Sequence, residues 1–504
     1  MKKIFFAFTL ALAASGCSKL DEQLKGDLTE QQALANPDIN SMLKGCYNAL
    51  RAPYMDLNTF FALQEVTSDA AIVPTRGPDW DDNGQWRVLH AHNWNADHIQ
   101  LASTFKNLLQ AQYACTNLLR FNPPARQAAE ARFLRAFTML SVLDAWGQVP
   151  FREAGEDLLQ PAKVLHAPQA LDFIISEATA ALPHLPATGA TRANQDAARM
   201  LLMKCLLNKG AFLDRAHPSF DAADMDRVIA LAGEISATGR YALSANYYDN
   251  FAPKNNLLSK ENIFTGENLG GVEGGFVNFY WKAALHINQA PSGWNGFSTL
   301  SDFYDKFESA DKRRGGDYPG MTEVAGIKAG FLVGPQYDQN GKQLADRKGN
   351  LLSFQRDVRL IETGHDLEMK GIRAIKYPID YAHPESNADN DFVFYRYADV
   401  LLMKAEALWR SGRAAEALAL VNEVRGVRGV RPMAALTADG LLDELGREFY
   451  WEAHRRTDLI RFGKWLLPWQ EKEASDPRNL LFPIPAQQLA VNPNLQQNPG
   501  YATN

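Results

Sequence analysis

The stretch that decides the fold lies near the C-terminus, where residues 447–463 read REFYWEAHRRTDLIRFG. Apolar side chains recur there at helical spacing, which predicts a helix from Asp439 to His454 and a charged helical face that continues to Arg461. On a helix, side chains three or four positions apart lie next to each other and pair when their charges are opposite. We interpret the charged residues as a structural network that pairs across helix turns or holds neighbouring backbone: Glu448, Glu452, Arg455, Arg456, Asp458 and Arg461.

The chain on both sides of this run is also rich in helical patterns. Apolar spacing, capping residues and breakers predict helices at 36–50, 101–121, 127–146, 168–182, 194–213, 223–238, 392–411 and 414–425. Pairs of helices of about this length, with Ala and Gly at close-packing positions, indicate degenerate tetratricopeptide (TPR) units, although the strict 34-residue pattern is absent. The sequence therefore predicts a mainly α protein in which each helical pair needs a neighbour to cover its apolar face.

The composition of the sequence changes between Tyr241 and Asp391. Gly, Asn, Pro and aromatic residues occur there in short runs with turn signals, which predicts a loop-rich lobe with short strands. The predicted organisation is a helical region at 36–240 with a ligand loop at about 64–98, the loop-rich lobe at 241–391, and C-terminal helices at 392–504. The lobe is thus inserted before the last helical pair.

The N-terminus has the features of an exported, lipid-anchored protein. Lys2 and Lys3 precede an apolar run at 4–14, which is too short to span a bilayer, and small residues lead up to Cys17. This pattern predicts a signal peptide at 1–16 and a Cys17 that carries acyl chains such as palmitate, followed by a tether at 17–35. No later stretch approaches the roughly 18 apolar residues of a spanning helix.

Composition narrows the possible partners. With 504 residues and 46% hydrophobic side chains the chain can bury a large core, and a net charge of −6 gives no broad basic surface for nucleic acid. After lipidation of Cys17, three cysteines remain, which is too few for a disulfide framework. A single bridge between Cys46 and Cys115 is conceivable, but three buried thiols, with Cys205, are the interpretation that we favour.

The C-terminal run closely resembles the SusD/RagB family, and the resemblance extends along the whole chain. It is carried by 447–463, by FPIP at 482–485, by NPNLQQNPGY at 492–501, by ARFLRA at 131–136 and by the lipoprotein start at Cys17. The resemblance implies a SusD-like fold, in which degenerate TPR helix pairs form a right-handed superhelix. It also implies a lipoprotein of the Gram-negative outer membrane and cell surface that captures nutrient oligomers, usually glycans, and covers a SusC-type TonB-dependent transporter. It implies no catalysis.

Two segments combine aromatic and polar residues as a sugar site requires, with flat faces against sugar rings and hydrogen-bonding groups at their edges. The first lies between the first two long helices and contains Trp80 and Trp86. By position, Trp94 resembles an aromatic platform of the starch-binding members of the family, and Asp69 and Arg76 resemble polar contacts.

The second segment, at 291–296, reads PSGWNG in the loop-rich lobe. A Gly-Trp turn presents an indole outward, so Trp294 is our strongest single candidate for a ligand contact, and Asn295 beside it is a candidate polar contact. We interpret Trp146, Trp451 and Trp465, which lie in helical patterns, as core or partner contacts.

The acidic loop after Arg76 raises two further possibilities. Asp79, Asp81 and Asn83 match the first half of a calcium loop, but His90 stands where a closing glutamate should be, so calcium is a weak candidate and no other cofactor is predicted. A glycosidase would need paired carboxylates near the aromatics, and Asp69, Asp79, Asp81 and Asp82 are available.

The sequence contains no motif of a hydrolase nucleophile, metalloprotease or phosphate loop. We therefore predict a non-enzymatic, oligosaccharide-binding surface lipoprotein that delivers its ligand to a SusC-type transporter. A TPR scaffold or peptide-binding lipoprotein remains the alternative, and a glycoside hydrolase is less favoured.

Overall fold

The computed structural model describes residues 37–502. The predicted signal peptide at 1–16, the lipid-carrying Cys17 and the tether at 17–35 lie outside the described residues. Ile39–Asn504 form one compact unit, with which the following description is concerned.

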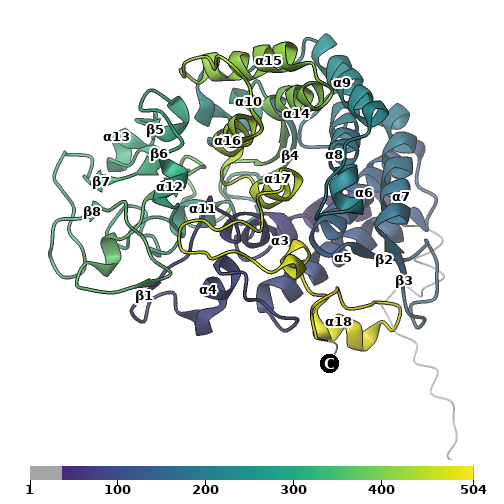
Figure 1. The fold of residues 1–504 in the computed structure, drawn as a ribbon, viewed down its shortest axis with the longest axis horizontal. Coiled ribbons are helices and arrows are strands. Elements are labelled where there is room, and N and C mark those ends of the chain that lie inside the picture. Colours follow the sequence, from purple (N-terminus) through teal and green to yellow (C-terminus); the bar gives the residue numbers. More distant parts are fainter. Residues whose placement is uncertain (1–36, 503–504) are drawn as a thin grey trace, which may run out of the picture. The chain divides into compact units, whose positions relative to one another are not determined.

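The N-terminal half consists of helices. They are α2 (Ile39–Asn48), α3 (Arg51–Tyr54), α4 (Gln85–His90), α5 (Ile99–Leu119), α6 (Ala125–Trp146), α7 (Ala167–Ala181), α8 (Gln195–Leu213) and α9 (Ala222–Ala237). Helices α2 and α5 to α9 agree closely with the predicted ones, whereas the short helices α3 and α4 were not predicted. Consecutive helices from α5 to α9 pack against each other (Figure 1). The local causes are those expected: the side chain of Asn194 caps α8 by accepting a bond from Ala197 N, and Gly147 ends α6 with a φ of 72°.

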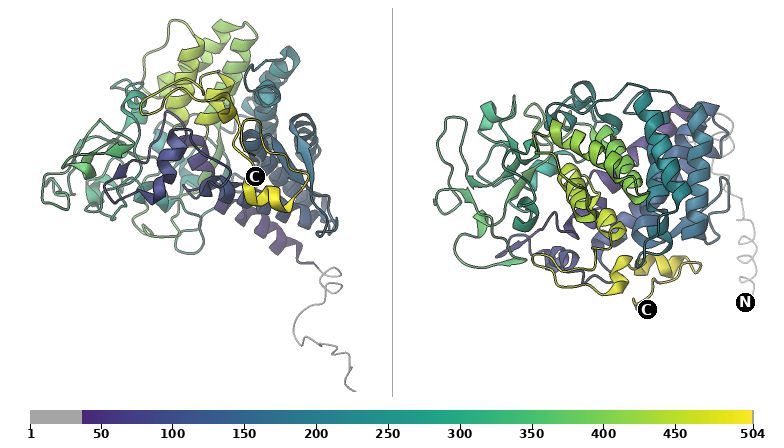
Figure 2. Two further views of the ribbon diagram at one scale, coloured as in Figure 1. Left: turned by 60° about the horizontal axis from the view of Figure 1, so that its bottom comes forward. Right: turned by 45° about the horizontal axis from the view of Figure 1, so that its top comes forward.

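The C-terminal helices continue this row. They are α14 (Tyr397–Arg410), α15 (Ala414–Val427), α16 (Ala438–Phe449), α17 (Arg455–Arg461) and α18 (Ala486–Val491). Helix α14 packs on both α15 and α9, so the last helical pair adjoins the N-terminal helices although a long insertion separates them in sequence. Figure 2 shows α5–α9 and the C-terminal helices next to each other, with the loop-rich segment on the other side.

The inserted segment is loop-rich with short strands, as predicted. Within it lie the strands β4 (Asn262–Gly266), β5 (Gly315–Gly316), β6 (Ala329–Leu332), β7 (Gly334–Pro335), β8 (Ser353–Phe354), β9 (Ile361–Glu362) and β10 (Arg373–Ile375), while β1 (Thr75–Arg76), β2 (Gln148–Phe151) and β3 (Lys163–His166) precede it and β11 (Phe392–Arg396) directly follows it. Its helices are α10 (Asn255–Leu258), α11 (Asn278–Lys282), α12 (Ser301–Tyr304) and α13 (Thr322–Ala325). The π-helical turn η1 (Ala62–Val66) and six 3₁₀ turns complete the described elements: η2 (Asp82–Gly84), η3 (Leu182–His184), η4 (Tyr247–Asn250), η5 (Lys312–Arg314), η6 (Leu367–Met369) and η7 (Pro477–Leu480).

Strand pairing joins segments that are distant in sequence. β4 and β11 pair antiparallel at the two ends of the insertion, and β1 pairs with β9 in parallel. The remaining described sheets are β10-β6-β5, β2-β3 and β7-β8. The β1-β9 pair matters for function because it attaches the N-terminal ligand loop to the loop-rich segment.

The predicted helix at 392–411 was wrong in its first turn. Residues 392–396 form β11, and α14 begins at Tyr397. Four of these five residues, FVFYR, are aromatic or β-branched, which favours a strand. The partner strand β4 supplies the backbone hydrogen bonds. Because this partner strand lies about 130 residues away in sequence, the local hydrophobic periodicity could not indicate it.

The predicted continuous helix through 447–461 was also wrong. Helix α16 ends at Phe449 and α17 begins at Arg455, because Trp451 and Ala453 adopt left-handed φ values of 61° and 60°. Non-glycine residues rarely take this conformation, so the turn must be held by its surroundings. Asp458 and Arg461 still pair within α17, while the other predicted charged residues pair with distant segments.

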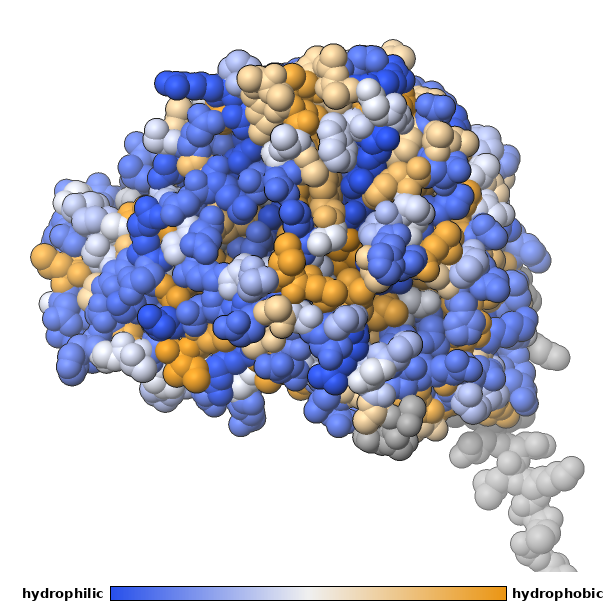
Figure 3. Space-filling view, in the orientation of Figure 1, coloured by the Kyte–Doolittle hydropathy of each residue, from blue (hydrophilic) through white to orange (hydrophobic). Residues whose placement is uncertain are grey.

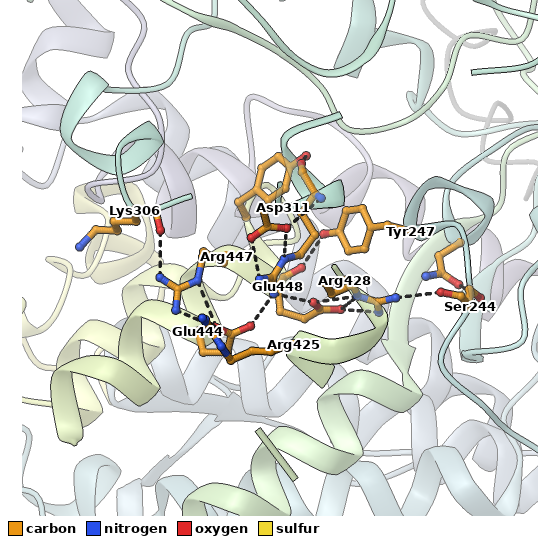
Figure 4. A network of polar contacts seen from close by, with 12 residues as sticks. Ser244, Tyr247, Lys306, Asp311, Arg425, Arg428, Glu444, Arg447 and Glu448 are labelled. Atoms are coloured by element: carbon orange, nitrogen blue, oxygen red, sulfur yellow. Dashed lines mark hydrogen bonds and ion pairs between the residues drawn. The ribbon is translucent and has the colours of Figure 1, made fainter. Parts of the chain in front are cut away.

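Glu448 is the centre of the buried charge network that this run forms (Figure 4). Its carboxylate oxygens lie 2.7–2.9 Å from guanidinium nitrogens of Arg313, Arg396 and Arg428, and all four side chains are almost completely buried. Burial alone would raise the pKa of Glu448, but the three arginines outweigh it and hold the pKa well below its ordinary value. The network therefore joins α16 to η5, to β11 and to the end of α15, which confirms its predicted structural character.

Buried side chains from the helical and loop-rich segments belong to one continuous core, which includes the predicted core residues Trp146, Trp451 and Trp465. The boundaries at 240 and 391 stay predictions. Cys46, Cys115 and Cys205 are free, buried thiols, as the favoured interpretation expected. The face in Figure 3 is mostly hydrophilic, with apolar residues gathered near its middle, where α17 lies in Figure 1.

Candidate functional site

The two predicted ligand segments meet in the structure. The guanidinium of Arg76 donates to the carbonyl oxygens of Asn295 and Gly296 at 2.9 and 2.6 Å, and the indole of Trp80 donates to the carbonyl of Trp294 at 2.7 Å. More than 200 residues separate these partners in sequence. The first segment therefore acts as the support on which the turn around Trp294 is built.

Trp294 begins a row of aromatic rings at the surface. Its side chain is 40% exposed, and its ring centroid lies 5.0 Å from that of Phe279, which lies 5.1 Å from that of Phe276. The ammonium of Lys282 lies 5.7 Å from the Trp294 ring and pairs with Glu385. Flat apolar faces with charged hydrogen-bonding groups at their edge are the combination that sugar recognition requires.

Two glycines make the turn possible. A Cβ at Gly293 would overlap the carbonyl oxygen of Leu285, and a Cβ at Gly296 would overlap the ring of Trp80. The backbone N–H of Trp294 donates to Lys282 O at 2.6 Å, which fixes the turn on the end of α11. The indole is therefore held outward by a closely packed backbone.

Asn295 and Arg76 were predicted as ligand contacts, and the structure places both in the interior. Asn295 is 4% exposed, and its side-chain oxygen accepts a bond from Arg373 at 2.8 Å. Arg76 is 2% exposed, and burial lowers its pKa to about 10. The polar groups of both residues form hydrogen bonds within the protein, so both residues stabilise the turn around Trp294.

Asp69 is likewise a structural residue. Its two carboxylate oxygens lie 2.6 and 2.8 Å from the guanidinium of Arg455, in a bidentate pair. Burial would raise the pKa of Asp69, but Arg455 outweighs this effect and holds the pKa below its ordinary value. The pair connects the first ligand segment with the start of α17.

The predicted platform at Trp94 is wrong in the structure. Trp94 is 2% exposed, its indole donates to Tyr501 Oη at 2.8 Å, and its ring packs on Phe482. The C-terminal segment thus covers this indole. Trp86 is equally buried and donates to Asp82 Oδ2 at 2.8 Å, so it is a core residue.

The acidic loop forms ion pairs where a calcium loop was considered. Asp79 pairs with Arg347, and Asp81 pairs with Arg87 at 2.5 Å. Asn83 adopts a left-handed φ of 55° within η2. Within residues 37–502, no three His, Cys, Asp or Glu side chains gather in a way that could hold a metal ion.

Sequence reasoning missed Phe276 and Phe279, although a signal was present. The residues before and within α11 read FVNFYWK from 276, and a spacing of three places both phenylalanines on one face of a helical turn. Tyr280 and Trp281, on the other face, are fully buried. The amphipathic pattern of this short segment could have separated the two sets.

Glu65, at the start of the first ligand segment, is a buried titratable residue. It lies in η1, its Oε1 accepts a bond from the backbone N–H of His454 at 3.0 Å, and its Oε2 has no hydrogen-bond partner within the described chain. Burial raises the pKa of Glu65 to about 7. This carboxyl therefore changes its charge near neutral pH, directly beside the left-handed turn between α16 and α17.

Replacing Glu65 by Gln should flatten the pH dependence of stability. An unfolded glutamate has a pKa near 4.5, so between about pH 4.5 and 7 the native state keeps a proton that the unfolded state has released. The free energy of unfolding must fall as pH rises through this range. Glu65→Gln removes the ionisation, and above pH 7 we expect the variant to exceed the parent by about 1–3 kcal/mol.

Urea denaturation at pH 5 and pH 8 measures this effect. The matched control is Glu416→Gln, which alters an exposed pair with Arg413. Parallel pH profiles for the parent and Glu65→Gln would contradict the assignment.

Comparisons with known proteins agree with this architecture. The model of the SusD family matches residues 260–475. The starch-binding protein SusD of Bacteroides thetaiotaomicron is 26% identical over 75% of this chain and 73% of its own length. The SusD-like protein P25 of Formosa agariphila is 25% identical over 79% of each chain.

Solved structures share the fold at lower identity. A SusD superfamily protein from Parabacteroides distasonis superposes with a TM-score of 0.73 and 17% identity, covering 94% of this chain and 100% of the other. The surface glycan-binding protein A of Bacteroides thetaiotaomicron gives a TM-score of 0.71 and 20% identity, covering 92% and 98%. The same protein has been solved in complex with laminarihexaose, where the TM-score is 0.66 and the identity 17%, covering 91% and 98%.

Within the described part of this chain, no helix is long and apolar enough to cross a membrane. The mainly helical fold is shared with the solved SusD superfamily protein and with the surface glycan-binding protein A. Residues 260–475 therefore match the SusD family, and over most of its length this chain is similar to SusD and to SusD-like proteins.

Proposed function

We propose that this protein binds oligosaccharides at the surface formed by Trp294, Phe279 and Phe276. The observation that carries the proposal is the exposed indole of Trp294, held outward by Gly293 and Gly296 and extended by two further rings. A single exposed indole needs no explanation, but contiguous exposed apolar surface such as this row of rings is typical of binding sites. The polar edge of Lys282 and Glu385 supplies hydrogen bonds for sugar hydroxyls.

The relatives support the same ligand class. One curated relative is named a starch-binding protein, and one solved relative is a complex with laminarihexaose. Transferred to this chain, these names favour a glycan over a peptide. They leave the linkage open, because Trp94, the residue that pointed to starch-binding members, is buried here.

We further propose that the protein is a lipoprotein of the outer membrane that passes its ligand to a SusC-type transporter. This part of the proposal is supported by the signal-like N-terminus with Cys17 and by similarity to the SusD family. A non-catalytic role fits the acidic loop, where Asp79 and Asp81 are each engaged by an arginine.

The test is a titration of the purified protein with oligomers of α-1,4-glucan, β-1,3-glucan, xylan and fructan, followed by tryptophan fluorescence. We expect a saturable change with at least one oligomer, and chromatography of the mixture should return the oligomer uncleaved. A panel without any saturable change would favour a scaffold or peptide-binding protein. Released products would establish a glycoside hydrolase.

A further inference from the structure

A second site candidate lies in the helical part of the molecule, away from Trp294. A half-open cavity of about 130 Å³ lies where α6, α8, α14, α16, α17 and β11 meet. None of the residues of the Trp294 surface lines it. An ordered water needs about 10–15 Å³ of such space, so the cavity has room for a molecule of roughly ten non-hydrogen atoms.

One side of the cavity is aromatic. Tyr54, Phe137, Phe394 and Tyr395 contribute rings to the lining, and neighbouring centroids lie 5.1–5.7 Å apart in tilted or edge-to-face arrangements. The Tyr54 hydroxyl is hydrogen-bonded to Ser141 at 2.7 Å. Ring faces of this kind pack well against the C–H faces of a saturated ring.

The lining also includes a polar group without a partner. Asp458 is 6% exposed; its Oδ1 accepts a bond from Arg461 at 2.7 Å, whereas its Oδ2 has no hydrogen-bond partner among the described residues. The imidazole of His454 stacks on Phe449 at 4.8 Å, and its ring nitrogens form no hydrogen bond within residues 37–502. Buried polar atoms are normally satisfied, so the unpaired Asp458 Oδ2 in a residue that lines the cavity, beside the half-buried imidazole of His454, indicates that something else binds there.

The backbone that presents His454 is strained. Trp451 and Ala453 are the two left-handed residues of the turn between α16 and α17, and Glu65 holds the turn from below through His454 N. Left-handed non-glycine residues cost of order 1 kcal/mol or more each and persist mainly where the surroundings enforce them. This turn brings Glu452, Ala453 and His454 together at the cavity wall.

The charges around the cavity favour a neutral ligand. The ammonium of Lys204 lies 2.6 Å from Asp399, and Arg461 is paired with Glu406 and Asp458. An added cation would face these basic groups, and an added anion would face the carboxylates, each with a desolvation cost. Hydroxyl groups avoid both costs, because a hydroxyl both donates and accepts hydrogen bonds.

We propose that this cavity binds a neutral polyhydroxylated molecule of the size of one monosaccharide. Its C–H face packs on the rings of Phe137 and Phe394, and its hydroxyls bond to Asp458 Oδ2 and the imidazole of His454. This site is separate from the Trp294 surface and does not rest on the proposed function of that surface.

The test is ligand-observed NMR with the purified protein and D-glucose, D-galactose, D-mannose and L-fucose, each tested separately. We expect saturable binding of at least one sugar. His454→Phe keeps a ring that stacks on Phe449 but removes both nitrogens, and should weaken binding about fivefold to tenfold. Leu140→Phe, which adds volume at the cavity wall, should abolish binding.

Trp294→Ala is the matched control and should leave monosaccharide binding unchanged. This variant therefore distinguishes binding in the cavity from binding at the Trp294 surface. The proposal is overturned if none of the sugars binds saturably, or if Trp294→Ala abolishes binding while His454→Phe does not. Crystals of the parent protein soaked in the bound sugar decide the case if a cavity variant fails to fold. Sugar density in the cavity supports the proposal, and ordered water alone overturns it.

Discussion

Replacing Glu448 by Ala should destabilise the protein by about 3–5 kcal/mol, a large part of the stability of an ordinary domain. The carboxylate lies at 2.7–2.9 Å from guanidinium groups of Arg313, Arg396 and Arg428. Its removal leaves three buried cations without their shared anion. Each arginine keeps another carboxylate partner, namely Asp311 and Glu444, Glu261 and Glu452, or Glu261. The loss still exceeds the value of a single ion pair, because one buried anion that three cations share is removed.

Chemical denaturation measures this effect, and two variants control for simpler explanations. Glu448→Gln keeps the size of the side chain but removes the charge, so it should lose much of the same stability. Glu416→Ala removes an exposed carboxylate on α15 that pairs with Arg413, and should change stability far less than Glu448→Ala. If Glu448→Ala costs no more than Glu416→Ala, the network does not hold the C-terminal helices in place.

The helical framework could be predicted because its causes are local. Helices α5 to α9 follow from apolar spacing, from the cap at Asn194 and from the breaker Gly147, all of which act within a few residues. The strand at 392–396 could not, because its partner β4 lies far away in sequence. The break after Phe449 was hidden for a related reason: Trp451 and Ala453 adopt unfavourable conformations that only tertiary contacts such as Glu65 to His454 N maintain.

The candidate site was predictable in its centre and not in its surroundings. Trp294 was found because Gly on both sides predicts a tight turn that presents its central side chain. Trp94 was wrong because polar neighbours in sequence do not report what covers a side chain in space, and here Tyr501 and Phe482 cover it. Arg76 and Asn295 were wrong as ligand contacts, because both are buried and their hydrogen bonds are made to the backbone and to Arg373.

Replacing Trp294 by Ala should abolish most of the oligosaccharide binding without unfolding the protein. An aromatic side chain at the centre of a contact surface typically contributes about 2 kcal/mol or more, which corresponds to a dissociation constant roughly thirtyfold higher. The indole is 40% exposed, and the turn is fixed by backbone bonds such as Trp294 N to Lys282 O. The stability should therefore change by less than about 1 kcal/mol.

The measurement is the oligosaccharide titration repeated by calorimetry, since the variant removes a fluorescent reporter. Tyr337→Ala is the matched control, because Tyr337 is also an exposed aromatic residue of the loop-rich segment, at 44%, and has no ring contact with Trp294. Phe279→Ala should weaken binding less than Trp294→Ala, since Phe279 extends the row but is less exposed than Trp294. If Trp294→Ala binds as tightly as Tyr337→Ala, the aromatic row is not the platform. The ligand would then have to be sought on another face, although the buried support formed by Arg76, Asn295 and Arg373 would remain as described.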